Sequence, residues 1–500
     1  MSAKAGAAEE RTWYRISPLD ETGVFLGLSM PQLIVGCAAA LTGALLMVFV
    51  SVPIGCVVVA TLGGLALARH SGEPVLHQLP TVARLAKQGT KARIWFEPTP
   101  LLGPTTNPKK LPAALAHQEL LTVDPVRYGV DLQGPVAVIR EQKAGIYAIT
   151  MRIAGRQFGL SEPHAQDFQL AQWGRILQGF VSEHPSIASV RWSEWASPSG
   201  VEEQREWLDR NLAAQHLPDV LASYQSLLAD LDTVATRHEV LLTLTTDPTR
   251  VRMQKRHRQN RHTAIIESLL TDTRLLIGRL EQGDLTVRVL DPTEWSRAMR
   301  LRLDPECRTI LDRRRRTLGN DAGIAPDNIL PTSTVTTRTW IAVDESLHRT
   351  YRVKEWPRLD VPGDWLTPLL TYAVHTRNIV VFFEPVSRSK SQRAITAQAT
   401  KIEADVEHRT SKGHRVGARH RRAAQAVKER EEELIGGHPE LSFGALVTIT
   451  ATNPDDLDRA CSDTTQIAAS VGIELRPLHG RHGEALTATL PCARTAIGKR

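Results

Sequence analysis

The feature that most constrains this chain is a run of 47 residues, Thr22 to Ala68, without Asp, Glu, Lys, Arg or His. One helix needs roughly 20 apolar residues to cross the hydrocarbon core of a bilayer. The run is therefore long enough for two crossings and a tight turn. Pro31 and Pro53 each suit the first turn of a helix. The sequence predicts a transmembrane hairpin of two helices within residues 30–70.

Two other interpretations of this run are weaker. A secretory signal peptide has a shorter apolar stretch followed by a small-residue cleavage site, and it starts closer to the N-terminus. A buried helical hairpin of a soluble protein would seldom contain so long a stretch without charge. The membrane interpretation is therefore favoured.

Basic residues in the short flanks predict the orientation, because such residues stay on the cytoplasmic side. The turn between the two helices has none. Both flanks contain several, namely Lys4, Arg11 and Arg15 before the run and Arg69, Arg84, Lys87, Lys91 and Arg93 after it. We therefore expect a two-helix protein of the cell membrane with its N- and C-termini in the cytoplasm.

Composition is compatible with a cytoplasmic domain next to a membrane. The chain has a net charge of +7, and a modest basic excess suits anionic lipid headgroups. Its five cysteines are scattered and form no CxxC pair, so we expect neither a zinc site nor a disulfide framework.

The remainder of the chain is long enough for two or three domains of ordinary size. Shifts in composition divide it into segments. They are a cytoplasmic N-terminal segment (1–29), the helix hairpin (30–70), a Pro-rich and irregular juxtamembrane region (71–127), a first α+β domain (128–303), a basic linker (304–330) and a second α+β domain (331–500).

Alternating β-rich and helical patterns predict an α+β fold class with mixed α/β domains. The first domain opens with a predicted β-hairpin over 136–153, followed by a helix that begins near Pro163. The second domain repeats this general plan without a visible residue-level repeat. We expect one strand over Thr332–Val343, a long charged helical hairpin over 387–436, and a final strand over Leu486–Leu490.

Motifs for chemistry are absent from the sequence. There is no GxxxxGK[ST] loop to hold nucleotide phosphates and no GxSxG nucleophile elbow. We therefore expect no enzymatic activity, no cofactor and no metal.

Three basic clusters are the candidate contact sites for lipid, nucleic acid or an acidic partner. A solvated surface is the more common role of such clusters. Their residues are Arg252, Lys255, Arg256 and Arg258 in the first, Arg313, Arg314, Arg315 and Arg316 in the second, and Arg415, Arg419, Arg421 and Arg422 in the third.

The N-terminal segment carries a family resemblance. Arg15-Ile16-Ser17-Pro18-Leu19-Asp20, followed by Gly27-Leu28-Ser29 and Gln32-Leu33, resembles the PrgI-type small membrane subunits of conjugative type IV secretion systems; Ser17 interrupts the first element. More loosely, the remainder resembles the N-terminal half of VirB/TraC-type secretion ATPases, with Phe158-Gly159-Leu160, Trp173-Gly174-Arg175 and the charged helical hairpin as matching parts. The P-loop domain of those ATPases has no counterpart here, which implies an ATPase-less relative of the kind found in actinobacteria.

This resemblance implies a non-enzymatic structural subunit of a secretion or conjugation machine. The implied partners are a separate P-loop ATPase, other secretion-channel subunits, membrane lipids and further copies of the chain. Two alternatives stay open: an EccE-like component of a type VII secretion system, and a membrane-tethered protein that binds DNA through the basic clusters.

Overall fold

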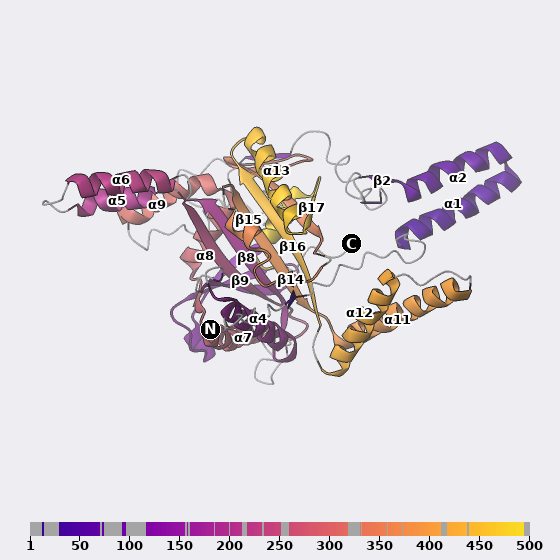
Figure 1. The fold of residues 1–500 in the computed structure, drawn as a ribbon, viewed down its shortest axis with the longest axis horizontal. Helices are drawn as coiled ribbons and strands as arrows, with labels where there is room; N and C mark the ends of the chain where they lie inside the picture. Colours follow the sequence, from indigo (N-terminus) through magenta and orange to yellow (C-terminus); the bar gives the residue numbers. More distant parts are fainter. Residues whose placement is uncertain are drawn as a thin grey trace, which may run out of the picture.

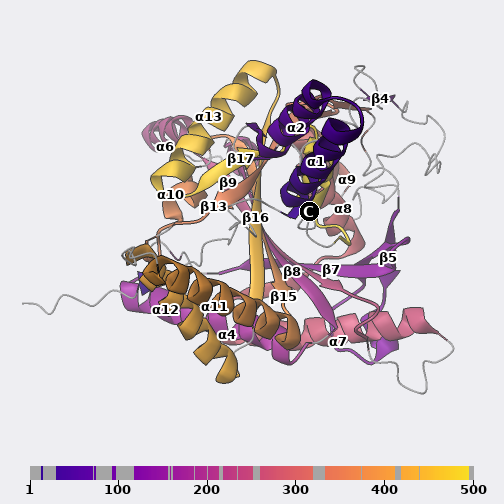
Figure 2. The same ribbon diagram turned by 90° about the vertical axis from the view of Figure 1, so that its right-hand side faces the viewer.

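The computed structural model describes residues 13–14, 30–70, 73–74, 93–96, 117–155, 158, 161–184, 186–199, 201–212, 218–232, 235–251, 260–318, 331, 333–357, 359–372, 374–411, 418–437 and 440–494. It is a mixed α/β structure with a large, bent antiparallel sheet at its centre (Figure 1). Helices cover both faces of the sheet, and several helical hairpins project beyond its ends (Figure 2). The expected mixed fold class is confirmed.

The first elements of the chain are an apolar helix pair and short strands: β1 (Trp13–Tyr14), α1 (Met30–Phe49), α2 (Val52–Leu67), β2 (Arg69–His70), β3 (Glu73–Pro74) and β4 (Arg93–Phe96), of which β4 belongs to the large sheet. The next elements are β5 (Gln118–Val123), η2 (Pro125–Tyr128), β6 (Val136–Glu141), β7 (Ile146–Ala154), α4 (Pro163–Ser182), β8 (Ile187–Pro198), α5 (Glu202–Asn211), α6 (Pro218–Asp232), β9 (Thr236–Thr246), α7 (Arg261–Gln282), β10 (Thr286–Val289), α8 (Pro292–Leu303), η5 (Pro305–Cys307) and α9 (Arg308–Leu318).

The second block follows the same plan. Its elements are β11 (Ser333–Thr336), β12 (Ile341–Val343), β13 (Ser346–Glu355), β14 (Val361–Pro362), α10 (Thr367–Thr371), β15 (Thr376–Pro385), α11 (Arg388–Ser411), α12 (Ala418–Ile435), β16 (Leu441–Ala451), α13 (Pro454–Ser470), β17 (Glu474–Pro477) and α14 (His482–Thr489).

The topology of the sheet is an internal duplication. Among the described residues it has 13 strands, ordered β4-β11-β12-β13-β16-β15-β8-β9-β7-β6-β5, with β10 on β7 and β17 on β13. The order β5-β6-β7-β9-β8 of the first block thus matches β11-β12-β13-β16-β15 of the second. The two blocks join where β8 pairs with β15, so a single sheet runs through both.

Individual residues repeat as well. Thr150 and Thr243 hydrogen-bond through their hydroxyls across β7 and β9, and Thr350 and Thr448 do the same across β13 and β16, each at 3.0 Å. The backbone N–H of Leu290 donates to the backbone carbonyl of Thr150, and that of Leu478 donates to the backbone carbonyl of Thr350, at 3.0 Å in both blocks.

The strand registers extend this equivalence to the junction. Arg191 lies opposite Thr243, and Asn378 lies opposite Thr448, so Arg191 and Asn378 are equivalent. Ser193 is then equivalent to Val380, two residues further on, and these two residues face each other in the β8–β15 pair. A local twofold axis therefore relates the two blocks and passes through this pair.

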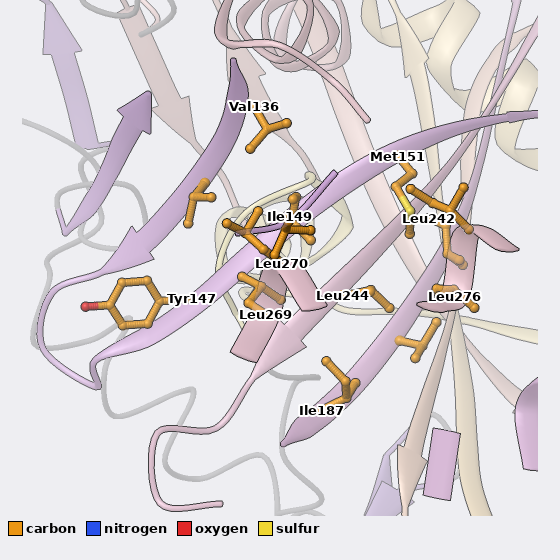
Figure 3. Packing of buried hydrophobic residues seen from close by; sticks show 14 of the residues in the cluster. Val136, Tyr147, Ile149, Met151, Ile187, Leu242, Leu244, Leu269, Leu270 and Leu276 are labelled. Atoms are coloured by element: carbon orange, nitrogen blue, oxygen red, sulfur yellow. The ribbon is translucent and has the colours of Figure 1, made fainter. Parts of the chain in front are cut away.

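One face of the first block is covered by α4 and α7. Figure 3 shows the core on this face, where side chains from β6, β7, β8 and β9 meet Leu269, Leu270 and Leu276 of α7. Most of these side chains are completely buried, and the intervening residues of β6 and β7 are buried on the opposite face, so both faces of the sheet are covered here. In the second block α13 covers the equivalent face.

The opposite face surrounds α8 and α14. One buried cluster contains Ala137 of β6 and Ile341 of β12, which belong to distant parts of the strand order, together with Trp295 of α8 and Leu486 of α14. The sheet must curl around the two helices to bring these residues together. An ion pair connects α8 to the sheet, because the guanidinium of Arg302 donates to a carboxylate oxygen of Glu239 on β9 at 2.8 Å. Burial alone would raise the pKa of Glu239, but Arg302 and Arg152 outweigh it and lower the pKa to about 2.

The segment after α14 is bound to β8 by a single arginine. Arg191 is 2 % exposed, and its guanidinium donates to four backbone carbonyls. Their distances are 3.2 Å for Ala488, 2.7 Å for Leu490 and 3.0 Å for Arg494, and the fourth acceptor is Cys492. Burial lowers the pKa of Arg191 to about 10, so the group is charged at neutral pH.

Two buried histidines join the helices of this face to the strands. The Nε2 atom of His348 lies 2.8 Å from the carbonyl of Leu303, and its Nδ1 atom lies 2.9 Å from the hydroxyl of Thr450. His482 accepts the backbone N–H of Thr350 at Nδ1. Burial lowers the pKa of His348 to about 4 and, with nearby cations, that of His482 to about 3.

These histidines predict a loss of stability in mild acid. The unfolded chain takes up protons below pH 6.5 while both folded histidines stay neutral, so stability is complete above pH 6.5 and falls towards pH 4. At pH 5 we expect a loss of about 2 kcal/mol per histidine, measured as the thermal midpoint of the detergent-solubilised chain.

The variant that tests this assignment is His348→Gln with His482→Gln, in which the decline between pH 6.5 and pH 5 should be much smaller. His164→Gln is the matched control, because the His164 side chain is 79 % exposed. An unchanged decline in the double variant would contradict the assignment.

Three sequence predictions about elements were wrong. The strand expected over Thr332–Val343 is two strands, β11 and β12, because Thr337 accepts from the backbone N–H of Trp340 and closes a turn between them. The strand expected over Leu486–Leu490 is the end of helix α14, whose apolar residues are buried in the curled sheet. In the juxtamembrane region expected to be irregular, β4 and β5 pair with β11 and β6.

Candidate functional site

The first candidate site is the α1–α2 pair, whose surface is apolar and unburied. Only 17 % of the window Gln32–Phe49 is buried, and it is the one helix within the described residues that is long and apolar enough to cross a membrane; α2 is shorter. The side chains of Ile34, Leu41, Leu45, Val48 and Phe49 are between 60 and 77 % exposed. Contiguous apolar surface of this kind marks a membrane or protein contact.

Two glycines set the contact between α1 and α2. A Cβ atom on Gly43 would collide with Val59, and one on Gly55 would collide with Met47 and lie 2.7 Å from the carbonyl oxygen of Gly43. Glycine has no Cβ atom, and this permits the close approach of the two helix backbones. The pair is therefore built to pack helix on helix.

Enlarging either glycine should separate the helices. Gly43→Leu or Gly55→Leu is expected to cost about 1–3 kcal/mol of overpacking and to reduce the amount of intact purified protein. Gly36→Leu and Gly63→Leu are matched controls in the same two helices, since a Cβ at either position meets nothing within 4 Å. Equal losses in all four variants would exclude a specific contact at Gly43 and Gly55.

A second candidate surface lies on α6, at the end of the molecule opposite α1 and α2 (Figure 1). Val220, Tyr224, Leu227 and Leu231 are between 38 and 62 % exposed. Their spacing of four, three and four residues is the a/d spacing of a coiled coil. Leu228, on the inner side of the same helix, is 4 % exposed. The helix thus has one face that packs inward and an apolar seam that faces solvent.

The helical hairpin expected over 387–436 is present as α11 and α12. Ile395 and Val427 of this hairpin are buried, whereas Ile435 at the end of α12 is 74 % exposed. The sequence between Arg409 and Arg422 contains six Lys and Arg residues and no acid. In the duplicated plan this hairpin occupies the place of α5 and α6, because each pair connects the two strands nearest the junction.

The three basic clusters lie apart from one another. The first, Arg252, Lys255, Arg256 and Arg258, and Arg415 of the third lie outside the described residues. Arg313 is exposed on α9, and the backbones of Arg314, Arg315 and Arg316 continue that helix. Arg419, Arg421 and Arg422 lie in the first turns of α12. Figure 1 places α9 beside α5 and α6, at the opposite end of the molecule from α12.

One cluster has the residue types of a hydrolase triad without its geometry. Ser186 and His184 both bond to Asp272, His184 through Nδ1 at 2.9 Å. A triad needs the serine hydroxyl on the other ring nitrogen. Here His184 Nε2 is buried without a hydrogen-bond partner. The described residues contain no group of three His, Cys, Asp or Glu side chains arranged to hold a metal ion.

Sequence reasoning missed the α6 seam and Arg191. The seam was visible as the 4-3-4 spacing of apolar residues, although only the structure shows that it faces solvent. Nothing in the sequence signals the role of Arg191, because its four acceptors lie about 300 residues away.

Comparison with known proteins adds no assignment. No protein-family model matches the chain, and no curated protein is significantly similar to it in sequence.

Proposed function

We propose that the chain is a non-enzymatic, membrane-anchored structural subunit of a type IV-like secretion or conjugation machine. In this proposal α1 and α2 both cross the cell membrane, and both termini are cytoplasmic. The soluble part is a platform for a separate P-loop ATPase, and it works with other channel subunits and further copies of the chain.

The observation that carries the proposal is the exposed apolar surface of α1. Five large side chains on one helix would each forfeit about 1.5–3 kcal/mol of burial if they stayed in water. A bilayer removes that penalty, and the uncharged run is long enough for α2 to cross as well. The PrgI-type resemblance of the N-terminal segment supports the choice of machine.

The position of α6 supports the platform role. With α1 and α2 in the membrane, α6 lies at the far end of the molecule, where cytoplasmic proteins have access to it (Figure 1). An exposed a/d seam is a surface that a partner helix fits, because knobs from one helix fill holes in the other. We assign this seam to the ATPase.

The test is a pull-down of the tagged full chain from its native cells in mild detergent, with the co-purifying proteins identified. Recovery of a P-loop ATPase in near-stoichiometric amount is the expected result. Recovery of the chain without any ATPase would contradict the platform role while leaving membrane anchoring intact.

An EccE-like type VII component is the second candidate, favoured by the same two-helix anchor and cytoplasmic domain. Co-purification of type VII core subunits in the pull-down would select it. A tethered DNA-binding protein is the third, favoured by the basic clusters. Retention on DNA should then fall steeply as salt rises, because phosphate contacts release counterions.

A further inference from the structure

Strand β5 forms an edge of the large sheet in the first block. Figure 2 shows it near the margin of the sheet, and no strand among the described residues pairs with its outer side. Its equivalent in the second block, β11, is not an edge, because β4 pairs with β11 in antiparallel register. Within the described part of the chain, the strand position that β4 fills in the second block therefore has no strand in the first.

The backbone of β5 presents alternate residues to this outer side. The backbone N–H of Gln142 donates to the carbonyl of His117, so the hydrogen-bonded pairs of β5 with β6 fall on every second residue from His117 onwards. The residues between them are Gln118, Leu120 and Thr122. Their backbone N–H and C=O groups point away from β6, towards the place where a further strand would lie.

The backbone of β11 has the same orientation, and there β4 makes use of it. The backbone N–H of Thr337 donates to the carbonyl of Trp340, so Thr334 and Thr336 direct their backbone groups away from β12. Both residues pair with β4. The strand registers of the two blocks make Leu120 equivalent to Thr336. The groups that hold β4 in the second block thus have outward-facing equivalents in the first.

Strand β5 lacks the features that protect an edge strand from pairing. Natural edges are short, or they contain Lys, Pro or a bulge. Strand β5 has six residues, none of them Lys or Pro, and its register with β6 contains no shift. Glu119 is neutralised by Arg140, 3.5 Å away. Leu120 and Leu121 are only partly buried and belong to the apolar clusters on opposite faces, so an added strand would extend both faces.

We propose that β5 pairs antiparallel with β5 of a second copy of the chain. This pairing rests on the further copies in the proposed function and names the surface at which they meet. With a twofold axis through Leu120, all three outward residues exchange hydrogen bonds, Leu120 with its own equivalent and Gln118 with Thr122 of the second copy. On the other face Glu119 lies opposite Leu121, so no like charges meet. The β8–β15 junction already joins two equivalent edges of this fold about a twofold axis.

The first test is a disulfide between two variants of the full chain, purified separately in mild detergent and then mixed under a mild oxidant. Glu119→Cys and Leu121→Cys should join, because opposite residues of a non-hydrogen-bonded pair have Cα atoms about 4.5 Å apart. Each variant alone is the matched control. Its own two copies are offset by two residues and lie about 8 Å apart, which is beyond disulfide range.

Three native cysteines must be removed before this test, while the remaining two are buried. The cysteines replaced by serine are Cys37, Cys56 and Cys307.

The second test blocks the edge without touching the ladder to β6. Thr122→Pro removes an outward N–H group, and proline is tolerated on an edge strand at such a position. Because the axis applies the loss twice, the dissociation constant of the dimer should rise at least about tenfold, measured by analytical ultracentrifugation in detergent. Thr122→Val is the matched control, since it keeps the N–H group and the size of the side chain. An unchanged thermal midpoint of the Thr122→Pro monomer shows that the fold is intact.

Each result either supports the pairing or overturns it. A disulfide in the mixture alone, together with weaker association of the folded Thr122→Pro variant, supports it. Disulfides of equal yield in the single variants would show random collision and overturn it. A dimer that Thr122→Pro leaves intact would place the contact between copies on another surface. A chain that stays monomeric would overturn the pairing and leave the membrane anchor and the ATPase contact standing, because neither involves β5.

Discussion

Replacing Arg191 with alanine is expected to lower the free energy of unfolding by about 3–5 kcal/mol, the range for breaking a buried charged network. The substitution removes the guanidinium that donates to the carbonyls of Ala488, Leu490, Cys492 and Arg494. The carbonyls of Leu490 and Cys492 each keep one backbone donor, from the N–H groups of Cys492 and Arg494. A buried carbonyl without a donor costs about 1–3 kcal/mol. We expect the thermal midpoint of the purified chain to fall by about 3–5 °C.

Cysteine reactivity gives a local readout of the same variant. Cys492 is completely buried beside Arg191, and burial raises the pKa of its thiol to about 12. If the segment after α14 detaches, Cys492 should react with a maleimide under native conditions. Cys461, buried in α13, should stay protected. This difference would distinguish local release from global unfolding.

Two further substitutions serve as comparisons for Arg191→Ala. Arg191→Lys keeps the charge but offers three donors to four acceptors, so an intermediate loss is expected. Arg127→Ala is the surface control, because its side chain is 82 % exposed, and it should change stability by less than about 0.5 kcal/mol. A midpoint for Arg191→Ala within experimental error of the unmodified chain would refute the role assigned to this residue.

Charges placed in the α6 seam are expected to remove the ATPase from the pull-down. Leu227→Glu with Leu231→Glu puts two carboxylates at adjacent core positions of the seam. Each central residue of such a contact contributes about 2 kcal/mol or more, so the pair should weaken binding at least about 100-fold. Both side chains are exposed, at 51 and 41 %, and the fold should not change.

The control for the seam uses a leucine and a valine elsewhere that are also exposed, and to a greater extent than the two seam residues. Leu359 is 76 % and Val126 is 72 % exposed, and neither lies on α6. Leu359→Glu with Val126→Glu should leave the recovered ATPase unchanged. Equal recovery from the seam variant and the control would place the ATPase contact on another surface.

Local patterns predicted much of the fold. Asn453 and Asp291 accept the backbone N–H groups of Asp456 and Glu294, as expected for residues that precede a helix. The β-hairpin of β6 and β7 and the helical hairpin over 388–435 also lie close to their predicted positions. These elements are fixed by residues near them in sequence, and a single sequence contains that information.

The pairing of strands that lie far apart in the sequence could not be predicted from the sequence. The duplication was expected only as a general plan, because the repeated residues are few: Thr150-Met151-Arg152-Ile153 and Thr350-Tyr351-Arg352-Val353 are the clearest pair. The junction of β8 with β15 depends on two strands about 190 residues apart, and neither strand contains a signal for the other. The end of helix α14 was predicted to be a strand because its residues are buried on all sides. Its sequence therefore lacks the apolar spacing of three and four residues that marks a helix with one buried face.

The central claim is that α1 and α2 form a hairpin across the membrane. Ser51, in the turn between them, is the position that reports it, and Ser51→Cys in a chain with Cys37 and Cys56 replaced by alanine provides the probe. A membrane-impermeant maleimide added to intact cells should label this cysteine, whereas Ser161→Cys in the soluble part should be labelled only after permeabilisation. Labelling of Ser51→Cys only after permeabilisation would contradict the two-span anchor.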